Sequence, residues 1–378
     1  MNSKYLLLIV SILFSISIVA QTVSYTMEHD GLTREYNLYI PPSYDGSEVV
    51  PLLLNLHGYT SNMTEQEFYG DFRPIADTAN FLIVHPNGTF DGSGERWWNA
   101  YEVMTGPDDI GFLSALVDTI AENYAVNLDR VYSTGMSNGG FMSFELACEK
   151  SDIFAAVASV TGSMPINKPS NCNPNRPIPS MQIHGTADEV VPYNGSAQFE
   201  SVENVVDYWV TQTNSNSTPV EVNIPDTDPN DGSTAKQYIY ENGDQGTSVE
   251  HFKVENGGHT WPGSSINLPG SGSTNQDFDA SIEIWRFFSQ YDKQGFLNVE
   301  NIEKDNIKIY PNPTSSKVSF ENLEHVSDLK IFDNKGSLIQ TFSDVGSELT
   351  ISHQLQKGIY QVVFYSQNEL TTKKLVVQ

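Results

Sequence analysis

Apolar residues between positions 25 and 290 follow two patterns that alternate along the chain. Short runs, such as residues 51–56 and 81–84, are continuously apolar, which is typical of buried strands. Longer segments place apolar residues on one helical face; over residues 107–124 these are Phe112, Leu113, Leu116, Val117 and Ile120. This alternation predicts a doubly wound, mostly parallel α/β sheet. Residues 211–246, rich in Asn, Asp, Ser and Thr, are expected to form long surface connections.

The pattern changes near Leu297, where a polar and charged stretch begins. Beyond it, short strand-like runs are separated by turn residues such as Asp333-Asn334-Lys335-Gly336. This spacing is typical of a small all-β sandwich. We therefore predict an α/β domain over residues 21–292, a linker over residues 293–304 and a β-sandwich domain over residues 305–378.

The first residues of the chain have the features of a secretory signal peptide. Lys4 supplies a positive charge, residues 5–19 are apolar, and Ala20 offers a small residue at the expected cleavage site. The apolar run is shorter than the roughly 20 residues that a membrane-spanning helix requires. We expect a signal peptide over residues 1–20, export through the periplasm to the medium or cell surface, and no stable membrane insertion.

The most specific chemical motif is Gly135-Met136-Ser137-Asn138-Gly139-Gly140. It follows the strand-like residues 130–134 and precedes the helix-like residues 141–148. A serine between two glycines on such a turn is the sequence form of a nucleophile elbow in α/β-hydrolases. The turn is so tight that side chains at the two flanking positions would clash, which explains the glycines. The motif predicts that Ser137 is a nucleophile.

A serine nucleophile needs a general base, and that base needs an acid that orients it. In α/β-hydrolases the three follow in the order serine, acid, histidine. Asp188 lies in a turn after the strand-like residues 181–184, and His259 lies in a glycine-rich loop after residues 251–254. We predict a triad of Ser137, Asp188 and His259, with Glu189 and Asp207 as alternative acids.

Acyl transfer also requires two backbone N–H donors for the negative oxygen that develops. Asn138, directly after the nucleophile, is the first expected donor, and Tyr59, after an early strand, is the second. We interpret His57 as a structural residue that supports this loop through a hydrogen bond. His85 and His184 end strands and are also interpreted as structural.

Two loops carry tryptophans near these positions. Exposed tryptophans on such loops can stack on sugar rings or on an aromatic acyl group. We predict substrate contacts for Trp97, Trp98, Asn99 and Trp261, with a role in the core as the alternative. Asp108-Asp109 precedes an apolar helix and is interpreted as a helix cap rather than a metal pair. No metal and no cofactor is expected.

The net charge of the chain limits the classes of partner that it can bind. The formal net charge of −27 argues against nucleic acid and anionic membrane surfaces, which require clustered Lys and Arg, whereas a neutral polymer or small ester is compatible. Almost all of this charge lies in the α/β domain.

The two cysteines, Cys148 and Cys172, are expected to form a disulfide in an oxidising compartment, with two buried free thiols as the alternative.

Residues 25–290 resemble secreted esterases of carbohydrate esterase family one and polyhydroxybutyrate depolymerase-like proteins. The likeness rests on His57-Gly58, Trp98-Asn99, Asp108-Asp109-Ile110-Gly111-Phe112-Leu113, the Ser137 elbow, His184-Gly185-Thr186-Ala187-Asp188 and Gly258-His259-Thr260-Trp261-Pro262-Gly263. The resemblance implies the α/β-hydrolase fold and the triad, and it supports the disulfide. The family includes feruloyl esterases, acetyl xylan esterases and polyester-cleaving enzymes. Tyr59 departs from polyester depolymerases, which often carry cysteine there.

The last 74 residues resemble the C-terminal sorting domain of the type IX secretion system of Bacteroidota. The likeness rests on Ile309-Tyr310-Pro311-Asn312-Pro313, Gly358-Ile359-Tyr360 and Lys373-Lys374-Leu375-Val376-Val377. It implies recognition by the type IX machinery, after which such tails are often removed. A carbohydrate-binding or fibronectin-like module is the alternative, but the tail contains no tryptophan to stack on sugar.

These observations lead to one main hypothesis. The chain is expected to be a secreted serine ester hydrolase that acts through an acyl-enzyme and removes feruloyl or acetyl groups from plant xylan. The alternative substrate is polyhydroxybutyrate or another polyester. A non-catalytic polysaccharide-binding protein and a protease of the same fold are further alternatives.

Overall fold

The computed structural model describes residues 21–100, 106–266, 270–297, 307–323, 326–333, 338–343, 345–353, 355–366 and 369–378. The chain divides into two compact units, Met1–Leu297 and Asn298–Gln378. The predicted signal peptide and the larger part of the predicted linker lie outside the described residues. None of the helices in the described parts is long and apolar enough to span a membrane.

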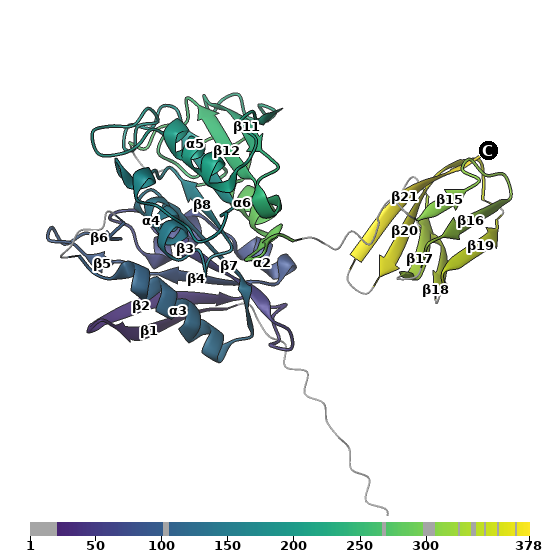
Figure 1. Cartoon of the computed structure of the whole chain (residues 1–378), viewed down its shortest axis with the longest axis horizontal. Coiled ribbons are helices and arrows are strands. Elements are labelled where there is room, and N and C mark those ends of the chain that lie inside the picture. The colour runs from purple at the N-terminus through teal and green to yellow at the C-terminus, as the bar shows by residue number, and fades with distance from the viewer. Residues whose placement is uncertain are drawn as a thin grey trace, which may run out of the picture. The chain divides into compact units, whose positions relative to one another are not determined.

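A ten-stranded sheet forms the centre of the larger unit (Figure 1). Its strand order is β1-β2-β4-β3-β7-β8-β9-β12-β11-β10. The six strands from β4 to β12 in this order are parallel, and antiparallel pairs extend both edges. The bounds are β1 Gln21–His29, β2 Leu32–Ile40, β3 Val50–Leu56, β4 Leu82–Pro86, β7 Val126–Met136, β8 Ala156–Val160, β9 Ser180–Gly185, β10 Val220–Asn223, β11 Thr234–Tyr240 and β12 Val249–Glu255. The predicted doubly wound, mostly parallel sheet is confirmed.

Helices cover both faces of this sheet (Figure 1). All seven residues of β3 are buried, and alternate side chains enter different cores. Leu52, Leu54 and Leu56 pack in a cluster with residues of α3, α4 and α5, whereas Leu53 packs with residues of α1, α2 and α6. The bounds are α1 Met63–Tyr69, α2 Arg73–Ala79, α3 Asp109–Asn123, α4 Asn138–Glu149, α5 Val202–Thr213 and α6 Ala280–Phe288. Because alternate strand residues point to opposite faces, the continuous apolar run in β3 serves both layers.

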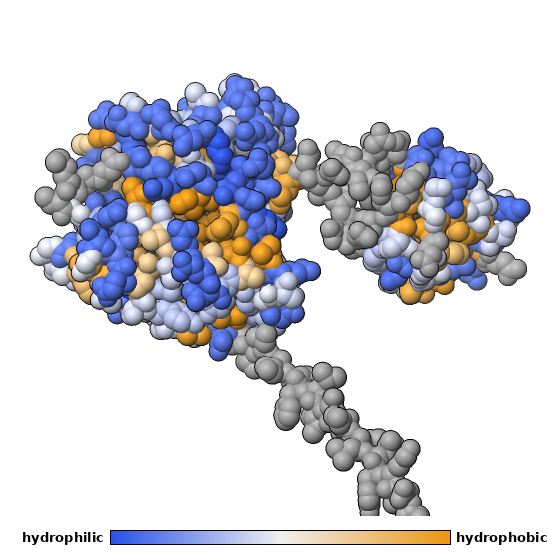
Figure 2. All heavy atoms as spheres, turned by 60° about the horizontal axis from the view of Figure 1, so that its bottom comes forward, coloured by the Kyte–Doolittle hydropathy of each residue, from blue (hydrophilic) through white to orange (hydrophobic). Residues whose placement is uncertain are grey.

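Two expectations about the larger unit require correction. Part of the polar segment predicted to form surface connections instead forms β10 and β11, which extend one edge of the sheet. All four residues of β10 are exposed, so this edge strand needs no apolar run. The linker begins later than predicted, because β13 (Tyr291–Asp292) pairs with β14 (Gly295–Phe296) and the Phe296 ring packs edge-on against Tyr291. On the face shown in Figure 2, polar residues cover much of this unit.

The smaller unit is all-β, as predicted. It contains a three-stranded sheet, β15-β16-β19, and a four-stranded sheet, β18-β17-β20-β21. Buried side chains from both sheets, including Phe320 and Phe364, form its own core. The bounds are β15 Lys308–Tyr310, β16 Lys317–Glu321, β17 Val326–Phe332, β18 Leu338–Ser343, β19 Glu348–Ser352, β20 Gly358–Ser366 and β21 Glu369–Val377.

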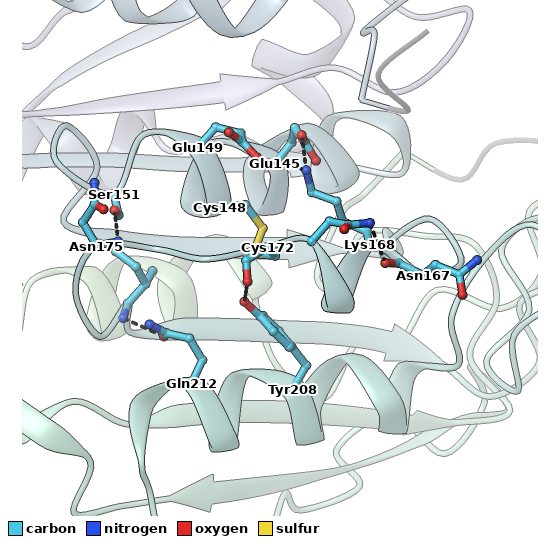
Figure 3. The surroundings of a disulfide bond; sticks show 12 residues. Glu145, Cys148, Glu149, Ser151, Asn167, Lys168, Cys172, Asn175, Tyr208 and Gln212 are labelled. Carbon is cyan, nitrogen blue, oxygen red and sulfur yellow. Dashed lines mark hydrogen bonds and ion pairs between the residues drawn. A yellow bond between two sulfur atoms is a disulfide. The ribbon is translucent and has the colours of Figure 1, made fainter.

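The predicted disulfide between Cys148 and Cys172 is confirmed (Figure 3). Cys148 lies in the last turn of α4, and Cys172 follows the short helix η1 (Lys168–Ser170). Beside the bond, the Nζ of Lys168 lies 2.6 Å from Glu145 Oε1, and the Tyr208 hydroxyl donates to the Cys172 carbonyl. The disulfide therefore joins the end of α4 to the segment that leads toward β9, and it holds the helix that begins directly after Ser137.

Candidate active site

Ser137 lies between the end of β7 and the start of α4 in a strained backbone conformation. Its φ of 54° and ψ of −119° place it in a region that non-glycine residues rarely adopt. The Ser137 N–H donates to Val160 O at 2.8 Å, and the Ser137 carbonyl accepts from Phe141 N at 3.0 Å. Hydrogen bonds to the neighbouring strand and to the new helix therefore hold the strained turn.

The glycines beside Ser137 permit backbone contacts that any side chain would prevent. A Cβ on Gly139 would lie 2.3 Å from the carbonyl oxygen of Leu56, at the end of β3. A Cβ on Gly135 would lie 2.6 Å from the carbonyl carbon of Gly139. The predicted crowding of this turn is confirmed, and it brings the elbow against the loop that follows β3.

Asp188 and His259 come together at the carboxyl ends of two neighbouring parallel strands, β9 and β12. The His259 Nδ1 lies 2.7 Å from Asp188 Oδ2. Gly185 makes this approach possible, because a Cβ at that position would lie 2.1 Å from Gly257 O. Asp188 is buried whereas Glu189 is exposed. Of the acids considered from the sequence, Asp188 is therefore the one hydrogen-bonded to His259.

The surroundings of Asp188 keep it ionised. Its Oδ1 accepts from the N–H groups of Val190 and Val191, both at 2.8 Å. Burial alone would raise the pKa of Asp188, but hydrogen bonds from His184 and His259 outweigh burial, and the pKa lies well below the usual range. His184 Nε2 lies 3.3 Å from Asp188 Oδ2, so this histidine, interpreted as structural, holds the acid from the other side.

Ser137 and His259 line one cavity of about 780 Å³, which we call the active-site cavity. Most of its other lining residues come from the loop after β3 and from α1, and the full set is Gly58, Tyr59, Thr60, Ser61, Thr64, Glu65, Gln66, Phe68, Tyr69, Met136, Ser137, Val190, His259 and Ile266. Tyr59, Phe68, Val190 and Ile266 are 48%, 55%, 57% and 37% exposed. The sequence interpretation did not single out Phe68, Val190 or Ile266, because no local pattern marks an apolar residue that stays exposed.

The loop after β3 lies against the serine, at the position predicted for the second backbone donor. A Cβ on Gly58 would lie 3.5 Å from Ser137 Cβ. Asn138 is fixed by two reciprocal bonds with Trp98: its Oδ1 accepts from Trp98 N at 2.6 Å, and its Nδ2 donates to Trp98 O at 3.0 Å. Within the described residues, the backbone N–H groups of Tyr59 and Asn138 have no hydrogen-bond partner.

His57 supports this loop as a neutral side chain. The Gly88 N–H donates to His57 Nε2 at 2.9 Å, so the proton is on Nδ1, which lies 2.7 Å from Gly58 O. Burial lowers the pKa of His57 to about 4. The structural role predicted for His57 agrees with these contacts.

The predicted stacking of Trp98 and Trp261 on substrate is wrong. Both rings are buried, with exposed fractions of 0% and 1%. Their indole N–H groups are satisfied internally, since Trp98 donates to His57 O and Trp261 to Ser281 Oγ. Both tryptophans are core residues that support the loops.

The predicted substrate contacts of Trp97 and Asn99 find no support either. Asn99 fixes the loop, because its N–H donates to Asp109 Oδ2 and its Nδ2 donates to Pro107 O. Trp97 is half-buried, and neither residue lines the active-site cavity. Asp108 caps α3 by accepting from Gly111 N, as predicted. Asp109 does not cap the helix: it is buried and forms an ion pair of 2.7 Å with Arg34.

Comparison with known proteins finds a matching family model for each of the two units. A family model described as esterase PHB depolymerase matches residues 34–172, and one described as secretion system C-terminal sorting domain matches residues 308–378. NocK of Nocardia uniformis subsp. tsuyamanensis, named as an esterase, is 31% identical over 257 residues, which are 62% of this chain and 73% of NocK. Feruloyl esterase C of Emericella nidulans is 34% identical over 170 residues, which are 43% of this chain and 57% of that enzyme.

One solved structure shares the fold over most of the larger unit. The acetyl xylan esterase from Aspergillus awamori matches 71% of this chain and 99% of its own, with a TM-score of 0.50 and 13% identity. The fold and the serine elbow define an α/β-hydrolase. The chain belongs to the esterase PHB depolymerase family of carboxylic ester hydrolases, and it ends in a secretion-system sorting domain. It spans about half the length of several of the feruloyl esterases that it matches.

Proposed function

We propose that this protein is a secreted serine esterase that removes hydroxycinnamoyl groups such as ferulate from plant xylan. The observation that carries the proposal is the active-site cavity, which is lined by Ser137 and His259 together with exposed apolar side chains. A volume of about 780 Å³ suits an aromatic acyl group. An acetyl group would contact only a small part of this surface, so the cavity favours feruloyl over acetyl substrates.

In the proposed mechanism, Ser137 Oγ attacks the ester carbonyl while His259 accepts the serine proton at Nε2. His259 Nδ1–H donates to Asp188 at 2.7 Å, which leaves Nε2 as the basic nitrogen. The lowered pKa of Asp188 keeps it negative, so it stabilises the imidazolium that forms. His259 then protonates the departing sugar alkoxide, and a water molecule releases the acid from Ser137.

The N–H groups of Tyr59 and Asn138 are proposed to bind the oxygen that becomes negative in both steps. Their lack of partners within the described residues supports this role, because each donor remains free for substrate. Asn138 is the first residue of α4, where the helix dipole also favours negative charge.

The proposal includes the route of export. The sorting domain implies passage through the type IX secretion machinery. We propose that residues 1–20 are removed as a signal peptide and that the smaller unit is the part recognised at the outer membrane. Mass measurement of the protein secreted by its native host tests the removal of residues 1–20 and shows whether the smaller unit is retained.

A substrate panel tests the catalytic proposal. Methyl ferulate, feruloylated arabinoxylan, acetylated xylan and polyhydroxybutyrate are compared for the wild type and for Ser137→Ala, with thermal unfolding as the control for folding. We expect the highest kcat/KM on the feruloyl substrates and a loss on the order of 10⁴-fold or more in Ser137→Ala, with an unchanged melting temperature.

Each outcome of the panel decides one part of the proposal. Retained activity in Ser137→Ala would overturn the assignment of the nucleophile. A clear preference for acetylated xylan would overturn the feruloyl assignment but keep the reaction. Preference for polyhydroxybutyrate would mean that the apolar rim serves a polyester chain.

A further inference from the structure

A second cavity, of about 640 Å³, lies beside the hairpin of β5 (Thr89–Phe90) and β6 (Arg96–Trp97), and we call it the hairpin cavity. Figure 1 labels both strands of this hairpin. Its lining combines polar and apolar surface and comes from β2, the residues after β4, and the residues before α3: Asp30, Leu32, Thr33, Arg34, Glu35, Asn87, Gly88, Thr89, Phe90, Arg96, Gly106 and Pro107. None of the residues proposed for catalysis lines it.

The hairpin forms a wall between this cavity and the active-site cavity. The Thr60 N–H donates to Arg96 O at 2.9 Å, and the Tyr59 hydroxyl donates to Asp91 Oδ2 at 2.9 Å. Tyr59 and Thr60 line the active-site cavity, whereas Arg96 lines the hairpin cavity. A polymer whose ester lies at Ser137 therefore has this second cavity on the other side of the hairpin.

The polar groups in the hairpin cavity are held in fixed positions. Arg96 donates from Nη2 to Glu35 Oε2 and from Nη1 to Gly88 O, both at 2.9 Å. Asn87 Nδ2 also donates to Glu35 Oε2, at 3.0 Å. Because these planar side chains are already ordered, a ligand that bonds to them avoids much of the entropic cost of binding.

An exposed aromatic ring lies beside these groups. The Arg96 guanidinium covers one face of Phe90, 4.3 Å from the ring centroid, yet Phe90 remains 61% exposed. The uncovered side of the ring can therefore pack against a flat apolar ligand surface. Both cations in the lining are already paired with carboxylates, since Arg96 pairs with Glu35 and Arg34 pairs with the buried Asp109.

An apolar ring face beside planar hydrogen-bonding groups, with both arginines already neutralised by carboxylates, matches the chemistry of a neutral sugar. We propose that the hairpin cavity binds pentose units of the xylan chain that carries the ester. This inference rests on the proposed function, because it makes the same polysaccharide the ligand of both cavities.

Binding and kinetics test the site separately from the reaction. Unesterified xylohexaose is titrated into wild type, Phe90→Ala and Val49→Ala by calorimetry. Val49 is a matched control, since it is also 61% exposed but precedes β3 at the strand end opposite the proposed catalytic residues. We expect saturable binding that Phe90→Ala weakens about fivefold and Val49→Ala leaves unchanged.

The same variants are then assayed on two ester substrates. Phe90→Ala should raise KM for a feruloylated arabinoxylan oligosaccharide about fivefold while kcat/KM for methyl ferulate stays unchanged. Absence of xylohexaose binding by the wild type, equal losses on both esters, or tighter binding of glucuronic acid would overturn the sugar site. Xylohexaose binding without hydrolysis of methyl ferulate would instead keep this site and overturn the proposed function.

Discussion

The floor and the rim of the active-site cavity are built in different ways. We define the floor as the lining residues Gly58, Ser137 and His259 together with Asn138 and Asp188, which adjoin them outside the lining, and the rim as Tyr59, Phe68, Val190 and Ile266. Floor residues are tied by hydrogen bonds, as between His259 and Asp188 or between Asn138 and Trp98. Rim side chains are all more than a third exposed. The floor thus fixes the reaction geometry, whereas the rim can vary to change the acyl group.

This difference has an energetic consequence. A floor substitution that removes a buried hydrogen bond or forces backbone apart typically costs about 1–3 kcal/mol of stability. A substitution of an exposed rim residue usually changes stability by less than about 0.5 kcal/mol. Variants of the floor should therefore lose activity on every ester, whereas variants of the rim should discriminate between esters.

The largest effect is expected for Asp188→Asn. The new amide can still accept from Val190 and Val191 through its oxygen, so the turn should remain folded. Its Nδ2 would face His259 Nδ1 and donate to it, which places the imidazole proton on Nε2 and removes the base. We expect kcat on methyl ferulate to fall on the order of 10⁴-fold, measured by steady-state kinetics.

Glu189→Gln is the matched control for this substitution. Glu189 is the neighbouring exposed carboxylate, and its loss should leave kcat within about twofold of the wild type because its side chain faces solvent and the described hydrogen bonds of Asp188 and His259 do not include it. A large loss in Glu189→Gln together with retained activity in Asp188→Asn would show that the hydrogen bond at 2.7 Å does not define the catalytic acid.

A smaller effect, on stability rather than on rate, is expected when the pH is lowered. Burial lowers the pKa of His57 to about 4, that of His85 to about 3 and that of His251 to about 4. In the unfolded chain these histidines have a pKa near 6.5. Below that pH the unfolded chain therefore binds protons that the folded chain excludes. The free energy of unfolding should be highest above pH 6.5 and should fall by about 1.4 kcal/mol per pH unit for each histidine as pH decreases toward 4.

Urea unfolding between about pH 7 and pH 5 measures this slope. Tryptophan fluorescence reports the larger unit alone, because all five tryptophans precede residue 298. In the described structure, neither ring nitrogen of His85 has a hydrogen-bond partner. His85→Leu should therefore remove the contribution of one histidine to the pH dependence of the unfolding free energy, without loss of a hydrogen bond. An unfolding free energy independent of pH would contradict the neutral, buried histidines.

Much of the floor could be predicted from the sequence because its requirements are local. Gly135 and Gly139 flank Ser137 within one turn, and the backbone contacts that they permit follow from that turn. The order of serine, acid and histidine, and the choice of Asp188, depend only on loops at the carboxyl ends of parallel strands. The disulfide was predictable since the chain has only two cysteines.

The features that could not be predicted from the sequence depend on contacts between distant segments of the chain. Trp98 was predicted to face substrate, but its indole N–H meets His57 O, 41 residues earlier, inside the molecule. The rim combines the loop after β3, α1, the turn after β9 and the loop after β12, and no single segment marks its apolar residues as exposed. The strand β10 was missed because an exposed edge strand has no apolar face to bury.

The smallest effect, and the sharpest test of the rim, is expected for Phe68→Ala. Phe68 is 55% exposed on α1, and its only described ring partner is the Arg73 guanidinium, 4.5 Å from the centroid. Loss of roughly 1 kcal/mol of apolar contact should raise KM for methyl ferulate about fivefold, with KM for p-nitrophenyl acetate unchanged because an acetyl group does not reach the rim. Phe68→Tyr keeps the ring and should match the wild type. Equal losses on both esters, or a lowered melting temperature, would place Phe68 with the floor and end the distinction between the two regions.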